Sequence, residues 1–477
     1  MNLIELDLTH VVVQREKEEE SVQRYRNTRI KHSAILRQPH AVGGLGREYD
    51  SLSRTSRRDV ASRVWVEGMS TKYTLSFQPR TYPHLGRPSH GHNISTLIYD
   101  ELTGSIIAGV NSDGGYGSNV FSWAPKYLED GRKEFRESSR RQIGYYPPRS
   151  PIACLCLTPS RVLLSISVDS SDQGEIIEMT TLVTPDSSHN WDAWPILDPG
   201  VTLRLRPHRP ITIFDVKASP SKLRPSTVAS ATEHGVGFFE ESESGYIDKP
   251  VESYRSSSHV LALTWLSDNL LAAGSRDGYI LFYDQRSGGN VLRLRHPSSV
   301  AHLRYADEHR IVAAGLENTL QTYDLRSSPL PSESSSGSYI YPGPKTHSPF
   351  PWTPPYITYP TYTNAAHMNL GFDVSPSLGL IAAAGEDKHI RMLELWTGKE
   401  AVRSFEGGSS GNAAGTGVSG GGVGTSGAFA GKVWSEGVRA LEFFGEFRGG
   451  YGRGVGAGGE EGGLVVGSGP VVEEWGW

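Results

Sequence analysis

The sequence predicts an all-β fold, a closed ring of seven four-stranded sheets. Two 16-residue segments, 271–286 and 311–326, align without a gap at an offset of 40 residues, and each contains an apolar strand, a turn with an acidic residue and a second strand. Weaker copies of this pattern occur on both sides, which gives seven candidate repeats between residues 86 and 477. Sheets repeated about every 40–45 residues are typical of a β-propeller, in which each repeat forms one blade.

Composition and charge exclude several classes of protein. The chain has 477 residues with a net charge of -5, so no overall positive field attracts nucleic acid, which is not an expected partner. The first residues lack the features of a signal peptide, and no apolar run approaches 18 residues, so no membrane association is expected. The only two cysteines, Cys154 and Cys156, predict a reducing compartment, which is the nucleus, the cytoplasm or both.

The chain divides into a ring and an arm. Residues 1–85 are predicted to form a basic, partly helical or disordered N-terminal arm, and residues 86–477 the propeller. The arm fits a nucleic-acid contact or a nuclear address as well as an ordinary solvated helix face. Val438–Trp477 is expected to close the ring with strands from the start of the chain, because an open sheet edge invites aggregation.

Three polar segments are predicted to be disordered insertions in the ring: 126–150, 328–365 and 407–432. The second is rich in proline, which cannot pair within a central strand, and the third is rich in glycine. Whether the second takes part in binding is left open at this point.

No catalytic, metal or cofactor site is predicted. Cys154 and Cys156 lie on one face of an expected strand, where they are interpreted as small buried residues because no further metal ligands accompany them. The histidines are scattered, and no Ser/His/Asp group or carboxylate pair is apparent.

The sharpest signal is the ending of the two best repeats, Tyr-Asp-x-Arg. The aspartate is expected to close the turn after the third strand of the blade, whereas the arginine is not required for the blade and is predicted to project from the rim. A guanidinium there suits the carboxylates or carbonyls of a partner. The predicted partner-binding residues are therefore Arg286 and Arg326. The residues predicted to support the blades are Asp277, Tyr283, Asp284, His296, Glu317, Tyr323 and Asp324.

The repeats resemble the WD40 repeat in period and in the Gly…Asp…Tyr-Asp pattern. Each 16-residue segment further resembles the "DWD box" of WD40 substrate receptors for cullin-4 RING ubiquitin ligases. The second segment fits throughout, the first departs at Gln285, and a third candidate breaks the pattern with Glu394-Leu395-Trp396. The stretch 261–406, about a third of the chain, is similar to the cullin-4-associated factor 4 group.

The resemblance implies a non-catalytic substrate receptor. It would dock through Arg286 and Arg326 onto an adaptor of the damage-specific DNA-binding protein 1 type and present an unknown protein substrate to a cullin-4 ligase. The alternative is a general WD40 scaffold in a nuclear chromatin or RNA-processing complex, in which these motifs only close blades. An enzyme with a propeller fold is a further alternative.

Overall fold

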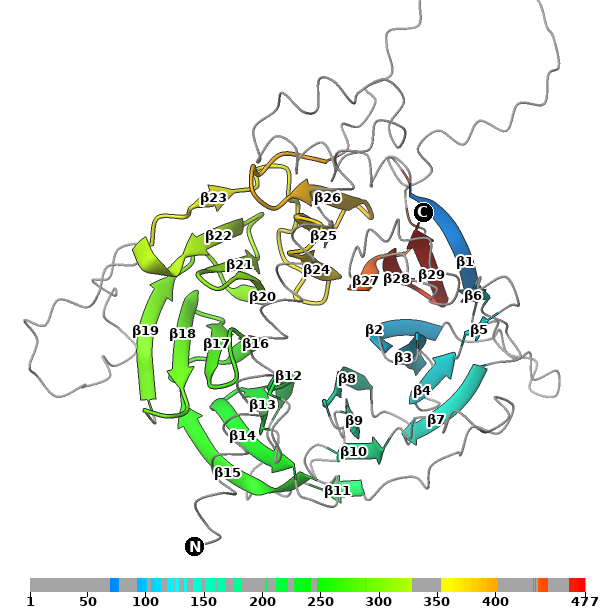
Figure 1. The fold of residues 1–477 in the computed structure, drawn as a ribbon, viewed down its shortest axis with the longest axis horizontal. Helices are drawn as coiled ribbons and strands as arrows, with labels where there is room; N and C mark the ends of the chain where they lie inside the picture. Colours follow the sequence, from blue (N-terminus) through cyan, green and yellow to red (C-terminus); the bar gives the residue numbers. More distant parts are fainter. Residues whose placement is uncertain are drawn as a thin grey trace, which may run out of the picture.

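The computed structural model shows β-sheets arranged radially around a central axis (Figure 1). It describes residues 69–76, 92–100, 104–112, 118–123, 125–127, 133–134, 140–146, 151–159, 162–167, 176–181, 202–204, 212–221, 227–241, 247–287, 289–327, 353–401, 432, 434, 436–444 and 463–476. In this part of the chain the regular structure is β-strand apart from one short 3₁₀ turn, η2 (Leu325–Ser327). No helix of these residues is long and apolar enough to cross a membrane.

Six sheets are four-stranded blades. In order around the ring, their strands are β27 (Val438–Phe444), β28 (Gly463–Ser468), β29 (Val471–Gly476) and β1 (Ser70–Ser76); β2 (His92–Asp100), β3 (Ser105–Ser112), β4 (Ser118–Trp123) and β7 (Arg140–Tyr146); β8 (Ile152–Leu157), β9 (Val162–Ser167), β10 (Ile176–Thr181) and β11 (Thr202–Arg204); β12 (Ile213–Ala218), β13 (Thr227–Thr232), β14 (Gly235–Glu241) and β15 (Ile247–Arg255); β16 (Val260–Trp265), β17 (Leu270–Ser275), β18 (Tyr279–Asp284) and β19 (Gly289–Arg295); β20 (Val300–Asp307), β21 (Arg310–Gly315), β22 (Leu320–Asp324) and β23 (Ile357–Thr358).

The prediction of seven four-stranded blades was wrong by one blade. The place between β20–β23 and β27–β1 holds a three-stranded sheet, β24 (Phe372–Ser375), β25 (Leu380–Ala384) and β26 (Ile390–Glu394). Beyond β26 the chain adds only an isolated bridge, Leu393 to Glu400, before the described residues stop at Ala401. Seven sheets therefore surround the axis, but only six have the four strands of a complete blade in the described part of the chain.

The two ends of the described chain close the ring. Strand β1 pairs antiparallel with β29, and β29, β28 and β27 complete the same sheet. This confirms the expectation that Val438–Trp477 joins strands from the start of the chain. It also shows that the ring begins before residue 86, because β1 lies in the range predicted to be the arm.

Two predicted insertions are shorter than expected. The segment 126–150 contains the short pair β5 (Lys126–Tyr127) and β6 (Lys133–Glu134) and then β7, which is the outer strand of its blade. The end of the segment 328–365 supplies β23 and the buried side chains of Tyr359 and Tyr362. The predicted disorder of 407–431, and the helix or disorder predicted before Met69, lie outside the described residues.

Small residues in the second strand of each blade let neighbouring blades approach. In β17 and β21 the sequence Ala-Ala-Gly is completely buried. A Cβ atom on Gly274 would lie 2.4 Å from Val300 Cγ1 of the next blade, so only glycine fits there without movement. Apolar clusters of this kind join adjacent sheets around the ring, for example between β17 and β20 and between β2 and β28.

Hydrogen bonds from aspartate side chains link the innermost strands of neighbouring sheets. Asp215 of β12 accepts a hydrogen bond from the backbone N–H of Leu263 in β16, at 3.0 Å. Asp373 of β24 does the same for Phe443 of β27, at 2.9 Å, and also pairs with Arg304 Nε at 2.9 Å. Each aspartate thus accepts a hydrogen bond from a backbone N–H of the following sheet. This bond constrains the angle between the two neighbouring sheets.

Candidate interaction surface on one rim of the ring

The two Tyr-Asp-x-Arg endings occupy equivalent places in neighbouring blades. They stand at the ends of β18 and β22, where the chain turns toward the outer strand. In each blade this turn is hydrogen-bonded to the turn between the first two strands, from Gln285 N to Asn269 O at 3.0 Å and from Leu325 N to His309 O at 2.8 Å. Arg286 and Arg326 therefore lie on the same rim of the ring, one blade apart.

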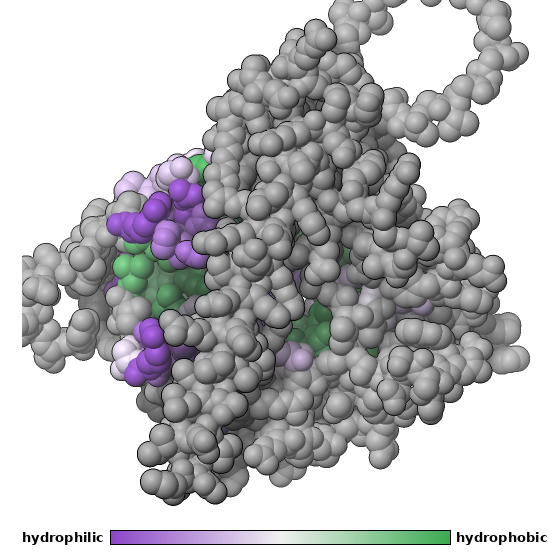
Figure 2. Space-filling view, in the orientation of Figure 1, coloured by the Kyte–Doolittle hydropathy of each residue, from purple (hydrophilic) through white to green (hydrophobic). Residues whose placement is uncertain are grey.

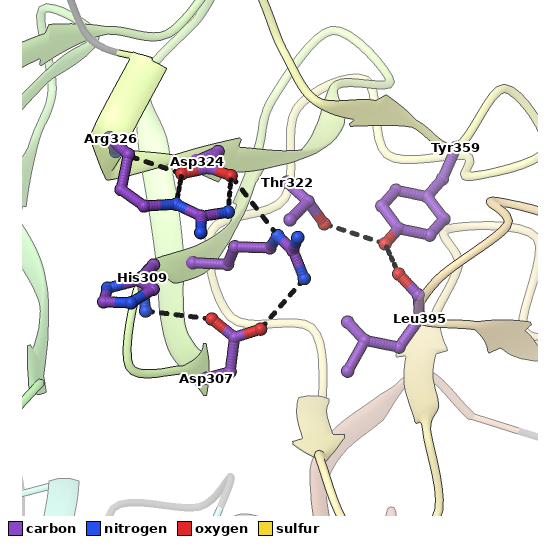
Figure 3. A network of polar contacts seen from close by, with 8 residues as sticks. Asp307, His309, Thr322, Asp324, Arg326, Tyr359 and Leu395 are labelled. Carbon is purple, nitrogen blue, oxygen red and sulfur yellow. Dashed lines mark hydrogen bonds and ion pairs between the residues drawn. The ribbon is translucent and has the colours of Figure 1, made fainter. Parts of the chain in front are cut away.

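Each arginine is held by the aspartate two residues before it. Arg286 donates from Nε and Nη2 to the two carboxylate oxygens of Asp284, at 3.1 and 3.0 Å. Arg326 makes the same fork with Asp324, at 3.0 and 2.6 Å (Figure 3). The backbone N–H of each arginine also donates to its aspartate, at 2.9 and 3.0 Å, so the carboxylate closes the turn and orients the guanidinium together.

These side chains remain open to solvent. The side chains of Arg286 and Arg326 are 73% and 58% exposed. The hydrogen bonds from the arginines hold the pKa of both aspartates below the usual value, so both pairs are ionised at neutral pH. Within the described part of the chain, Nη1 of both arginines has no partner, and its N–H groups are available to an acceptor on another molecule.

The buried residues behind the Arg326 motif form a polar network. His296 contacts Tyr323 Oη through Nδ1 and Thr319 Oγ1 through Nε2, both at 2.9 Å, and it is completely buried. Burial lowers the pKa of His296 to about 3, so the ring is neutral under ordinary conditions. The network fixes β22, the strand that ends in Asp324. In the preceding blade Tyr283 is equally buried.

Asp277 and Glu317 lie on the opposite rim, in the turns between the second and third strands. The Asp277 carboxylate accepts a hydrogen bond from the Ser275 hydroxyl, within its own turn. Glu317 has a left-handed backbone, with φ at 56°, and its N–H donates to Ala365 O at 3.1 Å. The structure thus separates the predicted residues into an Asp–Arg row on one rim and turn residues on the other.

Sequence reasoning missed the side chain that joins the Arg326 motif to its surroundings. Arg310 Nη1 pairs with Asp307 Oδ2 at 3.0 Å, and Arg310 Nε lies 3.6 Å from Asp324 Oδ2. Asp324 therefore serves two arginines, one exposed and one largely buried. Arg310 opens its strand outside the Tyr-Asp-x-Arg segment, and only the pairing of β21 with β22 places it opposite Asp324.

Other titratable groups in the described part of the chain include two buried cysteines and the carboxylate of Glu442. Cys154 and Cys156 are buried and form no disulfide, and burial raises the pKa of Cys156 to about 11, so it is not a reactive thiolate. Among the described residues no three His, Cys, Asp or Glu side chains are placed to hold a metal ion. Burial, with the nearby Asp373 carboxylate, raises the pKa of Glu442 on the inner strand β27 to about 8.

Comparison with known proteins adds one short match. No family model matches the sequence. A stretch of 81 residues is 35% identical to WD repeat-containing protein 21 of Schizosaccharomyces pombe, covering 16% of this chain and 19% of that protein. The chain thus matches about a fifth of the length of that relative. The match and the propeller together support a WD40-repeat β-propeller, a fold that serves protein–protein interaction.

Proposed function

We propose that this chain is a non-catalytic WD40 substrate receptor that docks onto the adaptor of a cullin-4 RING ubiquitin ligase through Arg286 and Arg326. The observation that carries the proposal is the pair of exposed guanidinium groups, each fixed by its own aspartate at the same place in neighbouring blades. The adaptor would be of the damage-specific DNA-binding protein 1 type. The chain would present a protein substrate to the ligase, in the nucleus or the cytoplasm.

The physical advantage of the Asp–Arg fork lies in orientation. An exposed ion pair contributes little to folding, so these pairs have little value as supports for the blade. A guanidinium already held by Asp284 or Asp324 loses less conformational freedom when a partner binds. Because each pair is neutral as a unit, its free N–H groups suit carbonyl oxygens as well as carboxylates.

A specific observation also favours the alternative, a general scaffold in a nuclear complex. The backbone N–H and the side chain of each arginine donate hydrogen bonds to the aspartate that closes the turn. The motif therefore also has a structural role within its own blade. Under this alternative the arginines would stabilise their own turns, and the partner would bind elsewhere on the ring.

Replacement of both arginines tests the proposal. Arg286→Ala with Arg326→Ala should leave the protein folded but weaken capture of purified adaptor by on the order of tenfold or more, because a central interface arginine typically contributes about 2 kcal/mol. Lysine at both positions should restore binding only in part, since the planar fork is lost. The measurement is adaptor pull-down beside a melting curve for each variant.

Arg276→Ala is the matched control. Arg276 is exposed in the same blade as Arg286 but in the turn on the opposite rim, so its loss removes one positive charge, as each single arginine replacement does, without touching the proposed surface. Adaptor binding by the folded double variant at the wild-type level would reject the receptor proposal in favour of the scaffold. Asp324→Ala is a poor control, because it releases both Arg326 and Arg310.

A further inference from the structure

The rim that carries Arg286 and Arg326 continues onto the next sheet with a different residue. At the end of β26 the place of Asp-x-Arg is taken by Glu394-Leu395-Trp396, so a tryptophan stands where the two preceding blades have arginine. Glu394 is buried and accepts a hydrogen bond from the Thr397 hydroxyl, which keeps this carboxylate inside the turn. Along three successive sheets the row is therefore Arg286, Arg326 and Trp396.

A second aromatic side chain reaches the same place from the end of the proline-rich segment. Tyr356 is 53% exposed, and in the described part of the chain no other large hydrophobic side chain is exposed to this degree. Its backbone N–H donates to Thr322 O at 2.8 Å, just before β23 pairs with β22. The tyrosine is thus fixed to the blade of Arg326.

Arg310 joins these aromatic side chains to Arg326. Its guanidinium lies 4.5 Å from the ring centre of Tyr356 and 5.5 Å from that of Trp396. The carboxylates of Asp307 and Asp324 balance its charge, and the same Asp324 holds Arg326 (Figure 3). Stacking on a fixed cation keeps the Tyr356 ring in one orientation although it faces solvent. We call Arg310, Tyr356 and Trp396 the aromatic patch.

The residue types of the aromatic patch fit a protein contact. In the neighbouring blade, on the side of the ring where Figure 1 places β18 and β19, Figure 2 shows hydrophobic residues between two hydrophilic areas. Tyrosine, tryptophan and arginine are the residue types that contribute most to protein interfaces, especially when neighbouring groups hold them in place. An exposed tyrosine anchored by a neutralised arginine has no folding role that requires its exposure.

We infer that the partner which meets Arg326 extends over the aromatic patch and places an apolar side chain against Tyr356. This inference rests on the proposed docking function and names the partner chemistry at that site. Continuity supports it, because Asp324 joins Arg326 and Arg310 in one network. Charge supports it too, because the carboxylates of Asp307 and Asp324 balance the charge of Arg310, so the patch offers aromatic faces rather than an unbalanced charge to its ligand.

The experiment compares Tyr356→Ala, Tyr356→Phe and Thr358→Ala for binding of purified adaptor by full-length protein. Tyr356→Ala should raise the Kd by about tenfold or more, and Tyr356→Phe should stay within about threefold of wild type, because the aromatic face rather than the hydroxyl makes the contact. Thr358 is exposed two residues further along the same segment and is the matched control, with a Kd near that of wild type. Melting curves establish that each variant is folded.

The outcomes separate the two proposals. Normal binding by folded Tyr356→Ala, together with loss of binding in the double arginine variant, would overturn the aromatic patch and leave the docking function in place. Absence of adaptor binding by the wild-type protein would overturn both. Equal losses in Tyr356→Phe and Tyr356→Ala would reject an apolar contact, because the hydroxyl would then be the essential group.

Discussion

At the scale of single residues, the same local geometry closes a turn and presents a cation. Asp284 and Asp324 each accept hydrogen bonds from the backbone and side chain of the arginine two residues on. A carboxylate that only capped the turn would need the backbone N–H alone. Each aspartate also orients the guanidinium of its arginine. This second role makes the motif a candidate binding group as well as a structural part of the blade.

Glu317 offers a prediction at this scale. Glu317 and Asn318 both have positive φ, 56° and 60°, in the tight turn between β21 and β22, where asparagine and glycine are preferred. Asn318 is already suited, and its side-chain oxygen accepts a hydrogen bond from Asn364 N at 2.7 Å. Glu317→Asn should therefore raise the free energy of unfolding by up to about 1 kcal/mol. Chemical denaturation measures this change, and a lower stability would contradict it.

At the scale of the strand, the buried Ala-Ala-Gly runs determine how closely blades pack. Gly274→Ala should lower the free energy of unfolding by roughly 1–3 kcal/mol, because the new Cβ would lie 2.4 Å from Val300 Cγ1 and 2.8 Å from Val300 Cβ. Gly437→Ala is the matched control, since nothing lies within 4 Å of a Cβ added there. Denaturant midpoints of both variants test the prediction, and equal midpoints would show that the blades can separate without cost.

The strands were predictable where period and composition agree. The sequence segments 271–286 and 311–326 each predict strand, turn and strand, and the structure has β17 with β18 and β21 with β22 there. The outer strands were harder, because they carry fewer buried residues. β7, with Arg140, Arg141 and Gln142, looks like a polar insertion, and β23 follows a run of prolines.

The site was predictable only within one repeat. Arg286 and Arg326 stand out because the motif recurs, whereas Arg310, Tyr356 and Trp396 come from separate segments that strand pairing and blade packing bring together. That the described residues supply only three strands to the sheet β24–β26 was equally unpredictable, since a repeat count assumes that every repeat is complete. Residues that contact each other across different repeats do not recur at a regular spacing in the sequence, so periodicity cannot identify them.

At the scale of the whole molecule, charged groups from several sheets meet along the axis of the ring. The Asp373 carboxylate of β24 raises the pKa of Glu442 on β27, whereas the cations Lys217 of β12 and Arg304 of β20 lower it. Burial and the Asp373 charge outweigh the two cations, which is why the pKa of Glu442 rises to about 8. His302 of β20 does not titrate with it, because burial lowers the pKa of that histidine to about 3.

This arrangement predicts how the stability of the ring depends on pH. Between about pH 4.5 and pH 8 the folded protein retains a proton on Glu442 that the unfolded chain releases, so this residue lowers the free energy of unfolding as pH rises through that window. The slope from one such group is on the order of 1 kcal/mol for each pH unit at most. Glu442→Gln keeps the shape of the side chain but cannot ionise, so it removes this contribution.

The variant should therefore have nearly wild-type stability at pH 5 and exceed the wild type at pH 8.5, while the other titrating groups affect both proteins alike. Denaturant midpoints at the two pH values give the difference directly. Parallel pH profiles for the two proteins would show that Glu442 ionises in the folded ring as easily as in the unfolded chain. In that case water must solvate the axis well enough to offset the effect of the Asp373 charge on Glu442. The hydrogen bonds between the inner strands would then lie in a hydrated channel, where each contributes less than in a dry interior.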